Sequence, residues 1–269
     1  MAFEDPDRPH EARRLRRGPP APSEDVALGR MLTPADYVSI GNALLGVLAV
    51  FLISLGHVEW AVLAILAAII GDGVDGAVAR LGYGGGPFGG KLDSFADFAT
   101  FGVAPATLLF HTYYQWEIVT DLRGPDILTA LAVGATAAGF ILGGMLRLIR
   151  FEVIGGSRRA DFFVGLSIPA AALMVTLPTW LGWASRHTLA LTWTVSLLMV
   201  SRVKFPKVRG PLMAPALLAL FLAIAIPDAY DQAFPKLLFS MMATYVVIGP
   251  FFVRWRAQRM AEYEAVWET

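Results

Sequence analysis

The chain lacks cysteine entirely and has few charged residues for its length of 269. Without cysteine it can form no disulfide bond, thiolate nucleophile or cysteine-ligated metal site. Charged residues make up 16% of the sequence and hydrophobic residues 56%, which is too apolar for an ordinary soluble domain and indicates a membrane protein. The net charge of zero and this composition give no reason to expect a nucleic-acid partner.

The first 33 residues differ from the rest because they are polar, charged and rich in proline. An arginine cluster at 13–17 is not followed by the apolar core of a cleaved signal peptide. We therefore expect residues 1–33 to form a polar cytoplasmic tail.

Beyond the tail, apolar segments recur at about the length that a helix needs to cross a bilayer, roughly 20 residues. They lie at 37–57, 58–79, 94–113, 126–148, 164–183, 188–202, 211–227 and 237–253. The sequence thus predicts an all-α, polytopic integral membrane bundle of about eight transmembrane helices.

Basic residues predict the orientation, because Lys and Arg gather on the cytoplasmic side of short loops. With the N-terminus inside, every Lys and Arg except Arg123, Arg186 and Lys236 falls on the cytoplasmic side. Six or seven spans would place the loop 201–210 or the basic segment 254–259 on the wrong face. We expect both termini in the cytoplasm and the protein in the cell membrane.

Acidic residues cluster where the second predicted helix ends and the third begins. Asp72 and Asp75 are three residues apart and Asp93 and Asp97 four apart, so each pair lies on one helix face. The short link between the helices makes them antiparallel neighbours, which brings the four carboxylates together near the cytoplasmic surface. Since four such acids repel one another, one or two divalent cations are expected among them. Oxygen ligands favour Mg²⁺ or Mn²⁺ over zinc.

Two familiar motifs do not fit this stretch. The sequence "GDGVDG" at 71–76 matches a dinucleotide fingerprint, but that motif needs a preceding strand and an opening helix. An EF-hand needs acids at alternate positions and a closing glutamate, which are missing here.

The whole pattern is more specific than its parts. Its fixed positions are Asp72, Asp75, Gly76, Ala79, Arg80, Gly89, Asp93 and Asp97. This spacing resembles the signature of the CDP-alcohol phosphotransferases, membrane enzymes that transfer a phosphoryl-linked group from a CDP-alcohol to a second alcohol and release CMP.

The resemblance implies a two-metal site. Asp72, Asp75 and Asp93 would bind one ion, and Asp72, Asp93 and Asp97 the other. Asp93 and Asp97 are the expected catalytic residues, with Asp97 as general base for the incoming hydroxyl. A metal-bound carboxylate is a weakened base, so direct acidification of the hydroxyl by the ion remains an alternative. The family also implies a homodimer.

Further residues are expected to contact the nucleotide. Arg80 would face the diphosphate or stabilise an aspartate, while Gly76 and Ala79 would be small enough to admit the cytidine, and Gly89 belongs to the same signature. Asn42, a polar residue in the first helix, either contacts the nucleotide or makes a helix-packing hydrogen bond.

Several stretches resemble one branch of the family, the small phosphatidylserine synthases and their archaeal archaetidylserine counterparts. They include "FGGKLDSFADFATFGVAPA" at 88–106 and "RLIRFEV" at 147–153. Ile149 and Glu152 depart from the branch, which usually has Ala and Asn there. The resemblance implies L-serine as acceptor and a CDP-diacylglycerol or CDP-archaeol as donor.

The resemblance also divides the chain into expected parts. After the tail of 1–33, residues 34–210 would form the phosphotransferase membrane domain. Residues 211–254 would add two helices, and 255–269 would form a second cytoplasmic tail.

The acceptor depends on how Arg147 and Arg150 are interpreted. They would bind a phosphorylated polyol such as glycerol phosphate or inositol phosphate, bind the carboxylate of serine, or mark the membrane boundary. A cation transporter is a further hypothesis, although its acids usually lie at mid-membrane on broken helices. A structural membrane protein would leave the aspartates unexplained.

Overall fold

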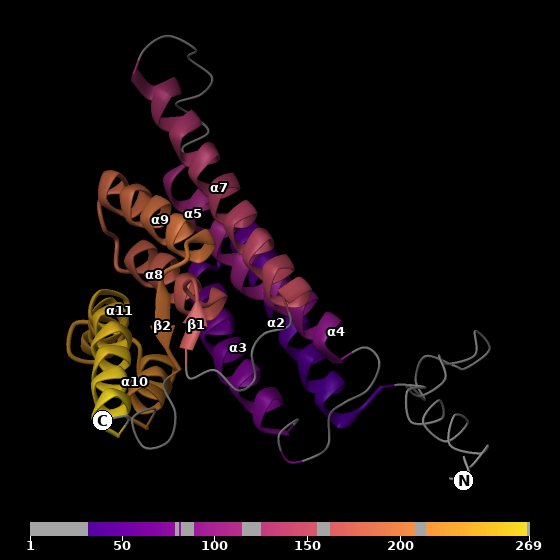
Figure 1. Cartoon of the computed structure of the whole chain (residues 1–269). Coiled ribbons are helices and arrows are strands. Elements are labelled where there is room, and N and C mark those ends of the chain that lie inside the picture. Colours follow the sequence, from indigo (N-terminus) through magenta and orange to yellow (C-terminus); the bar gives the residue numbers. More distant parts are fainter. Residues whose placement is uncertain are drawn as a thin grey trace, which may run out of the picture.

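The protein is a helical bundle in the computed structural model, which describes residues 32–78, 81, 89–114, 125–154, 162–207 and 214–267. The helices are α2 (Pro34–Ser54), α3 (Val58–Val78), α4 (Gly89–Asp97), η3 (Phe98–Val103), α5 (Ala104–Tyr113), α7 (Pro125–Ile154), α8 (Ile168–Trp180), α9 (Ser185–Val200), α10 (Ala214–Ala225) and α11 (Ala233–Trp267). Figure 1 shows α2, α3, α5 and α7 side by side, with α10 and α11 on the other side of α8. The predicted helical class is confirmed.

A capping box begins α2. The Thr33 main-chain N–H donates to Asp36 Oδ2 over 2.6 Å, and the Asp36 N–H donates to Thr33 Oγ1 over 3.4 Å. Pro34 occupies the first turn, where its missing N–H costs nothing. The start of α4 lies beside this cap, because a Cβ on Gly89 would be 3.6 Å from Asp36 Oδ1.

The third predicted helix is divided into α4, the π-helical turn η3 and α5. The Ala104 N–H bonds to the Ala99 carbonyl, five residues back, which is the π-helical pattern. Thr100 in η3 donates its hydroxyl to the Asn42 carbonyl over 2.9 Å. A Cβ on Gly46 would lie 2.6 Å from Thr100 Cα, so only glycine lets α2 approach η3 this closely.

The core lies around α8, whose described side chains are almost all buried. One apolar cluster includes Phe101, Phe140 and Leu166, and a second includes Ile53 and Ile65. Together they join α2, α3, η3 and α5 to α7, α8, α9 and α10. This packing joins α3, through Ala68, to η3, through Phe101, and η3 directly follows Asp97 of α4.

A small antiparallel ribbon was not predicted. Strands β1 (Phe162–Val164) and β2 (Lys204–Pro206) pair Phe163 with Phe205, so the all-α prediction is incomplete. The predicted span 164–183 also starts too early, because α8 begins only at Ile168. Tyr245 of α11 donates to the Pro206 carbonyl over 3.0 Å and holds β2 against the last helix.

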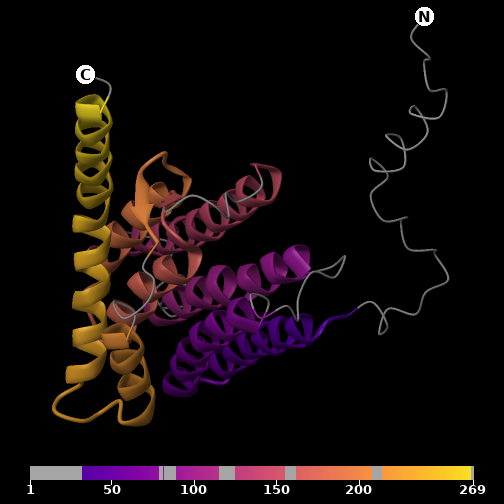
Figure 2. The ribbon, with the colours of Figure 1, turned by 60° about the horizontal axis from the view of Figure 1, so that its bottom comes forward.

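Three helices among the described residues are long and apolar enough to cross a membrane. They are Pro34–Ser54, Ile127–Val153 and Ala233–Arg256; α8 and α10 are shorter apolar helices. Helices occur at each of the eight predicted ranges, yet the number of crossings and the orientation remain predictions. Figure 2 shows α11, which extends beyond the predicted 237–253, along one side of the bundle next to α10. The apolar helices indicate an integral membrane protein.

Candidate active site

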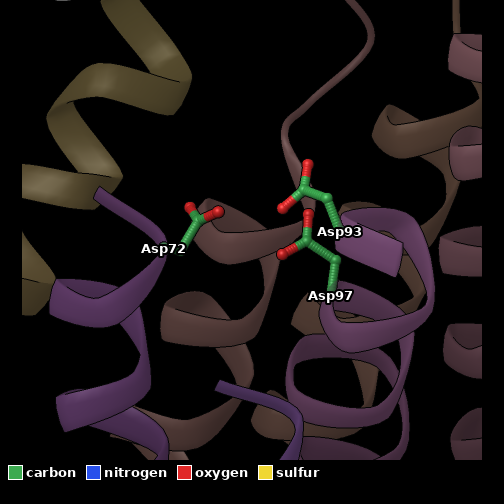
Figure 3. Close-up of side chains that lie close together, drawn as sticks. All are labelled: Asp72, Asp93 and Asp97. Atoms are coloured by element: carbon green, nitrogen blue, oxygen red, sulfur yellow. The ribbon is translucent and has the colours of Figure 1, made fainter. Parts of the chain in front are cut away.

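Three aspartates form the acidic centre of the bundle. Asp72 comes from α3, and Asp93 and Asp97 from α4; each offers one carboxylate oxygen, and these oxygens all lie within 4.8 Å of one another. Figure 3 shows Asp72 facing the pair across the gap between the two helices. Asp97 is buried and the other two are partly buried. The sequence therefore correctly predicted that acids of the second and third helices converge.

Local structure explains this convergence. Asp93 and Asp97 are four residues apart on α4 and so lie on one face of that helix. The π-helical turn η3 starts directly after Asp97, and π-helical turns often occur at functional sites. Because η3 packs against α2, the acidic face of α4 is held in a fixed position beside α3.

Part of the predicted site lies outside the described residues. Asp75 and Gly76 are in the last turn of α3, but the Asp75 side chain is not described. Ala79 and Arg80 are outside the described ranges altogether. The fourth carboxylate and the arginine of the signature therefore remain predictions.

Asn42 lies close to the acidic centre. Its side chain is buried, and its amide oxygen and nitrogen find no hydrogen-bond partner among the described residues. A Cβ on Gly71, the residue before Asp72, would be 3.6 Å from Asn42 Oδ1. A buried amide without partners is costly, and it marks a place where a polar ligand would fit.

Arg147 of α7 interacts with the acidic centre. It interacts electrostatically with Asp97, Asp72 and Asp93 and is partly buried. Its guanidinium also lies 5.8 Å from the centroid of the Phe151 ring. Arg147 is therefore near enough to the acidic centre to interact with it electrostatically, and its role in binding the acceptor remains a prediction.

Arg150, the other predicted acceptor-binding residue, has a different environment. Its guanidinium donates hydrogen bonds to main-chain carbonyls of α9, the residue after α9, and β1. These bonds leave it little freedom to turn toward a small ligand. The structure thus separates two arginines that sequence spacing had grouped together.

Sequence reasoning missed the contact between Ser94 and Glu152. The Ser94 hydroxyl donates to Glu152 Oε1 over 2.8 Å and joins α4 to the end of α7. Ser94 follows Asp93 directly, so this bond is adjacent to the acidic centre. The available signal was Glu152 itself, where the branch usually has Asn, because a longer acidic side chain can reach a neighbouring hydroxyl.

The donor set fits a hard divalent cation. Three carboxylates with oxygens within 4.8 Å can surround one ion, and oxygen ligands suit Mg²⁺ and Mn²⁺. Among the residues that the structure describes, no histidine joins this group and the chain has no cysteine, and a zinc site without either ligand would be unusual.

Comparison with known proteins agrees with this geometry. The family model described as CDP-alcohol phosphatidyltransferase matches residues 32–203, which include α2 to α9 and the three aspartates. An archaetidylserine synthase of Methanothermobacter thermautotrophicus is 32% identical over 191 residues, which cover 69% of this chain and 75% of the relative.

Two bacterial relatives extend the match. A CDP-diacylglycerol–serine O-phosphatidyltransferase of Helicobacter pylori is 30% identical over 232 residues, 82% of this chain and 90% of the relative. The enzyme of the same name from Bacillus subtilis is 34% identical over 171 residues, 63% of this chain and 87% of the relative. The resemblance inferred from the aspartate spacing is confirmed, and the chain belongs to the CDP-alcohol phosphatidyltransferase family.

Proposed function

We propose that this chain transfers the phosphatidyl group of a CDP-linked lipid to the hydroxyl of L-serine and releases CMP. The convergence of Asp72, Asp93 and Asp97 carries this proposal, because a diphosphate donor needs a cation-binding acidic centre beside it. The names of the relatives support serine as acceptor and a CDP-diacylglycerol or CDP-archaeol as donor.

The bonds of the reaction balance simply. The serine hydroxyl oxygen attacks the lipid-side phosphorus of the donor, and the bond from that phosphorus to the oxygen bridging to CMP breaks. CMP leaves with the bridging oxygen, and the hydroxyl proton passes to a base or to water. We assign the base to Asp97, which is buried and next to the other two acids.

The acids are expected to hold two ions, Mg²⁺ or Mn²⁺, with Asp75 completing the set. Bound cations would neutralise the diphosphate and the charge that develops on CMP. Asp72 and Asp93 would bind and orient the ions from two different helices. Asn42 would offer its buried side-chain amide to the nucleotide as a hydrogen-bonding group. Arg80, Ala79, Gly76 and Gly89 would lie around the diphosphate and cytidine, as the family signature implies.

Arg147 is the acceptor-binding residue that we favour. A guanidinium suits the carboxylate of serine, and Arg147 is close enough to the acids to interact with all three. Its positive charge would hold the acceptor carboxylate near the donor phosphorus. Arg150, with its guanidinium already hydrogen-bonded to carbonyls, fits this role less well.

The protein is expected to lie in the cell membrane with its site facing the cytoplasm. Each chain would have eight spans and both termini inside, and two chains would form a homodimer. The domain boundaries at 34–210, 211–254 and 255–269 belong to the same proposal. Basic residues support this orientation, since Arg202 just before β2 and Lys204 at its start are exposed.

The test is a CMP-release assay on the full chain in detergent with CDP-diacylglycerol and Mn²⁺. L-Serine, glycerol 3-phosphate and inositol phosphate are compared as acceptors, with Asp97→Asn as the inactive control. Serine-dependent release that Asp97→Asn abolishes would support the proposal. Release with only a phosphorylated acceptor would overturn serine, and release with none would favour the cation-transporter hypothesis.

A further inference from the structure

The environment of Arg150 is unusual because one guanidinium serves several main-chain acceptors. Its Nη1 donates over 2.9 and 3.0 Å, and its Nη2 over 2.6 and 3.0 Å. The acceptors are the carbonyl oxygens of Val200, Ser201, Val164 and Met199, respectively. The planar fork of an arginine side chain can reach such a set, whereas a lysine ammonium is a single point charge.

Three of these acceptors lie at the end of α9 or directly after it, and the fourth lies at the end of β1. The last carbonyls of a helix have no intrahelical donors, and Arg150 supplies donors to the end of α9. Its fourth bond reaches the final residue of β1. Gly165 follows β1 with a φ of +79°, and a Cβ there would overlap both Arg150 Nη2 and the Met199 carbonyl oxygen. Position 165, beside the guanidinium, therefore admits only glycine.

Arg147 precedes Arg150 by about one turn of α7, so both lie on one face of that helix, and holding these turns in place also fixes the backbone from which the Arg147 side chain extends. On its other side the same stretch of α7 is held to α4 by Glu152, which accepts from Ser94. Arg147, on the same stretch of α7, interacts electrostatically with the three aspartates.

We propose that Arg150 is a positioning residue: by binding the carbonyls at the ends of α9 and β1, it holds the last turns of α7 so that Arg147 faces Asp72, Asp93 and Asp97. This proposal deepens the proposed function. Of its two tests, only the activity measurement rests on that function. Arg150 itself touches neither donor nor acceptor.

The consequence is electrostatic and can be measured without turnover. A guanidinium facing the three carboxylates opposes a divalent cation among them, so withdrawing it strengthens cation binding. Arg150→Lys keeps the positive charge but loses the fork that binds the carbonyls. A change in cation affinity in that variant therefore reports the position of Arg147 rather than the charge of residue 150.

The experiment measures Mn²⁺ affinity by electron paramagnetic resonance of free Mn²⁺ with the full chain in detergent. We expect Arg147→Gln to bind Mn²⁺ about threefold tighter or more. Arg150→Lys should tighten binding to a similar degree, and the double variant should not exceed Arg147→Gln. Wild-type affinity in Arg150→Lys, or effects that add in the double variant, would overturn the proposal.

A second variant protects the test against misfolding. Gly165→Ala keeps Arg150 but intrudes between its guanidinium and the Met199 carbonyl, so Mn²⁺ binding should tighten here also. Unchanged Mn²⁺ affinity in whichever variant folds counts against the proposal.

The activity measurement then separates the two proposals. With serine as acceptor, Arg150→Lys should raise the KM for serine about fivefold, a loss of about 1 kcal/mol of acceptor binding, while the KM for the donor stays unchanged. If wild-type protein does not use serine, the proposed function fails, and the Mn²⁺ titration still decides the role of Arg150.

Discussion

Asp72 in α3 and Asp97 in α4 hold carboxylate oxygens within 4.8 Å of each other, although residues 79–88 separate the two helices in the sequence. Asp93 belongs to the same group (Figure 3). Carboxylates at this separation repel one another unless a cation balances their charge. The relationship therefore indicates cation binding more directly than any single residue does.

Removing one of these charges should weaken cation binding. Asp72→Asn keeps the size of the side chain but removes a negative ligand, and we expect Mn²⁺ affinity to fall about tenfold or more. Isothermal titration calorimetry on the purified chain measures this. Asp228→Asn, which changes an exposed acid outside the group, is the matched control and should bind Mn²⁺ as the wild type does. Equal affinity in Asp72→Asn and the control would contradict the assignment of the site.

Asn42 should show opposite effects on stability and binding. Replacing its buried amide by the similarly sized Leu removes two polar atoms without partners among the described residues. The free energy of unfolding should then stay the same or increase by up to about 1–3 kcal/mol. The affinity for CMP in the presence of Mn²⁺ should fall. Thermal unfolding in detergent and CMP titration measure the two quantities. A less stable variant with unchanged CMP affinity would instead make Asn42 a packing residue.

Two glycines of α2 give a matched pair. A Cβ on Gly46 would meet the Thr100 backbone, whereas a Cβ on Gly41 would meet nothing within 4 Å. Gly46→Ala should destabilise the protein by about 1–3 kcal/mol and lower turnover, since it displaces η3 next to Asp97. Gly41→Ala should be neutral or stabilising by up to about 1 kcal/mol. Unfolding midpoints and CMP release compare the pair; similar outcomes for both would contradict the close approach of α2 and η3.

The acidic centre was predictable because its signal is local. Asp72 ends one apolar segment, Asp93 and Asp97 begin the next, and helical spacing places the latter two on one face. The apolar segments likewise predicted a helix in each range, because hydrophobic runs of that length are typical of helices.

Other features depend on contacts between distant residues. The strands around Phe163 and Phe205 have three residues each, too short for an alternating pattern to be recognised. Arg147 and Arg150 look equivalent in sequence, and the structure distinguishes them by the carbonyls of α9 and β1 that bind Arg150 and by the aspartates that interact with Arg147. The π-helical turn after Asp97 was not predicted from the sequence, because the apolar segment 94–113 reads as one continuous helix.

The predicted orientation can be tested on α9, because the absence of native cysteine gives no background labelling. Arg186→Cys and Arg202→Cys make the same substitution at exposed positions near the two ends of this helix. In intact cells, a membrane-impermeant maleimide should label Arg186→Cys and leave Arg202→Cys unlabelled until the membrane is opened. The reverse pattern would invert the topology, and labelling of both would contradict a membrane-spanning α9.

The most direct test of the account is to follow both products of one reaction. Purified protein is given CDP-diacylglycerol, Mn²⁺ and isotopically labelled L-serine, and CMP and labelled lipid are quantified together. The account predicts equal amounts of CMP and labelled phosphatidylserine, both lost in Asp97→Asn and on removal of Mn²⁺ by a chelator. CMP release without labelled lipid, or labelled lipid that persists in Asp97→Asn, would contradict it.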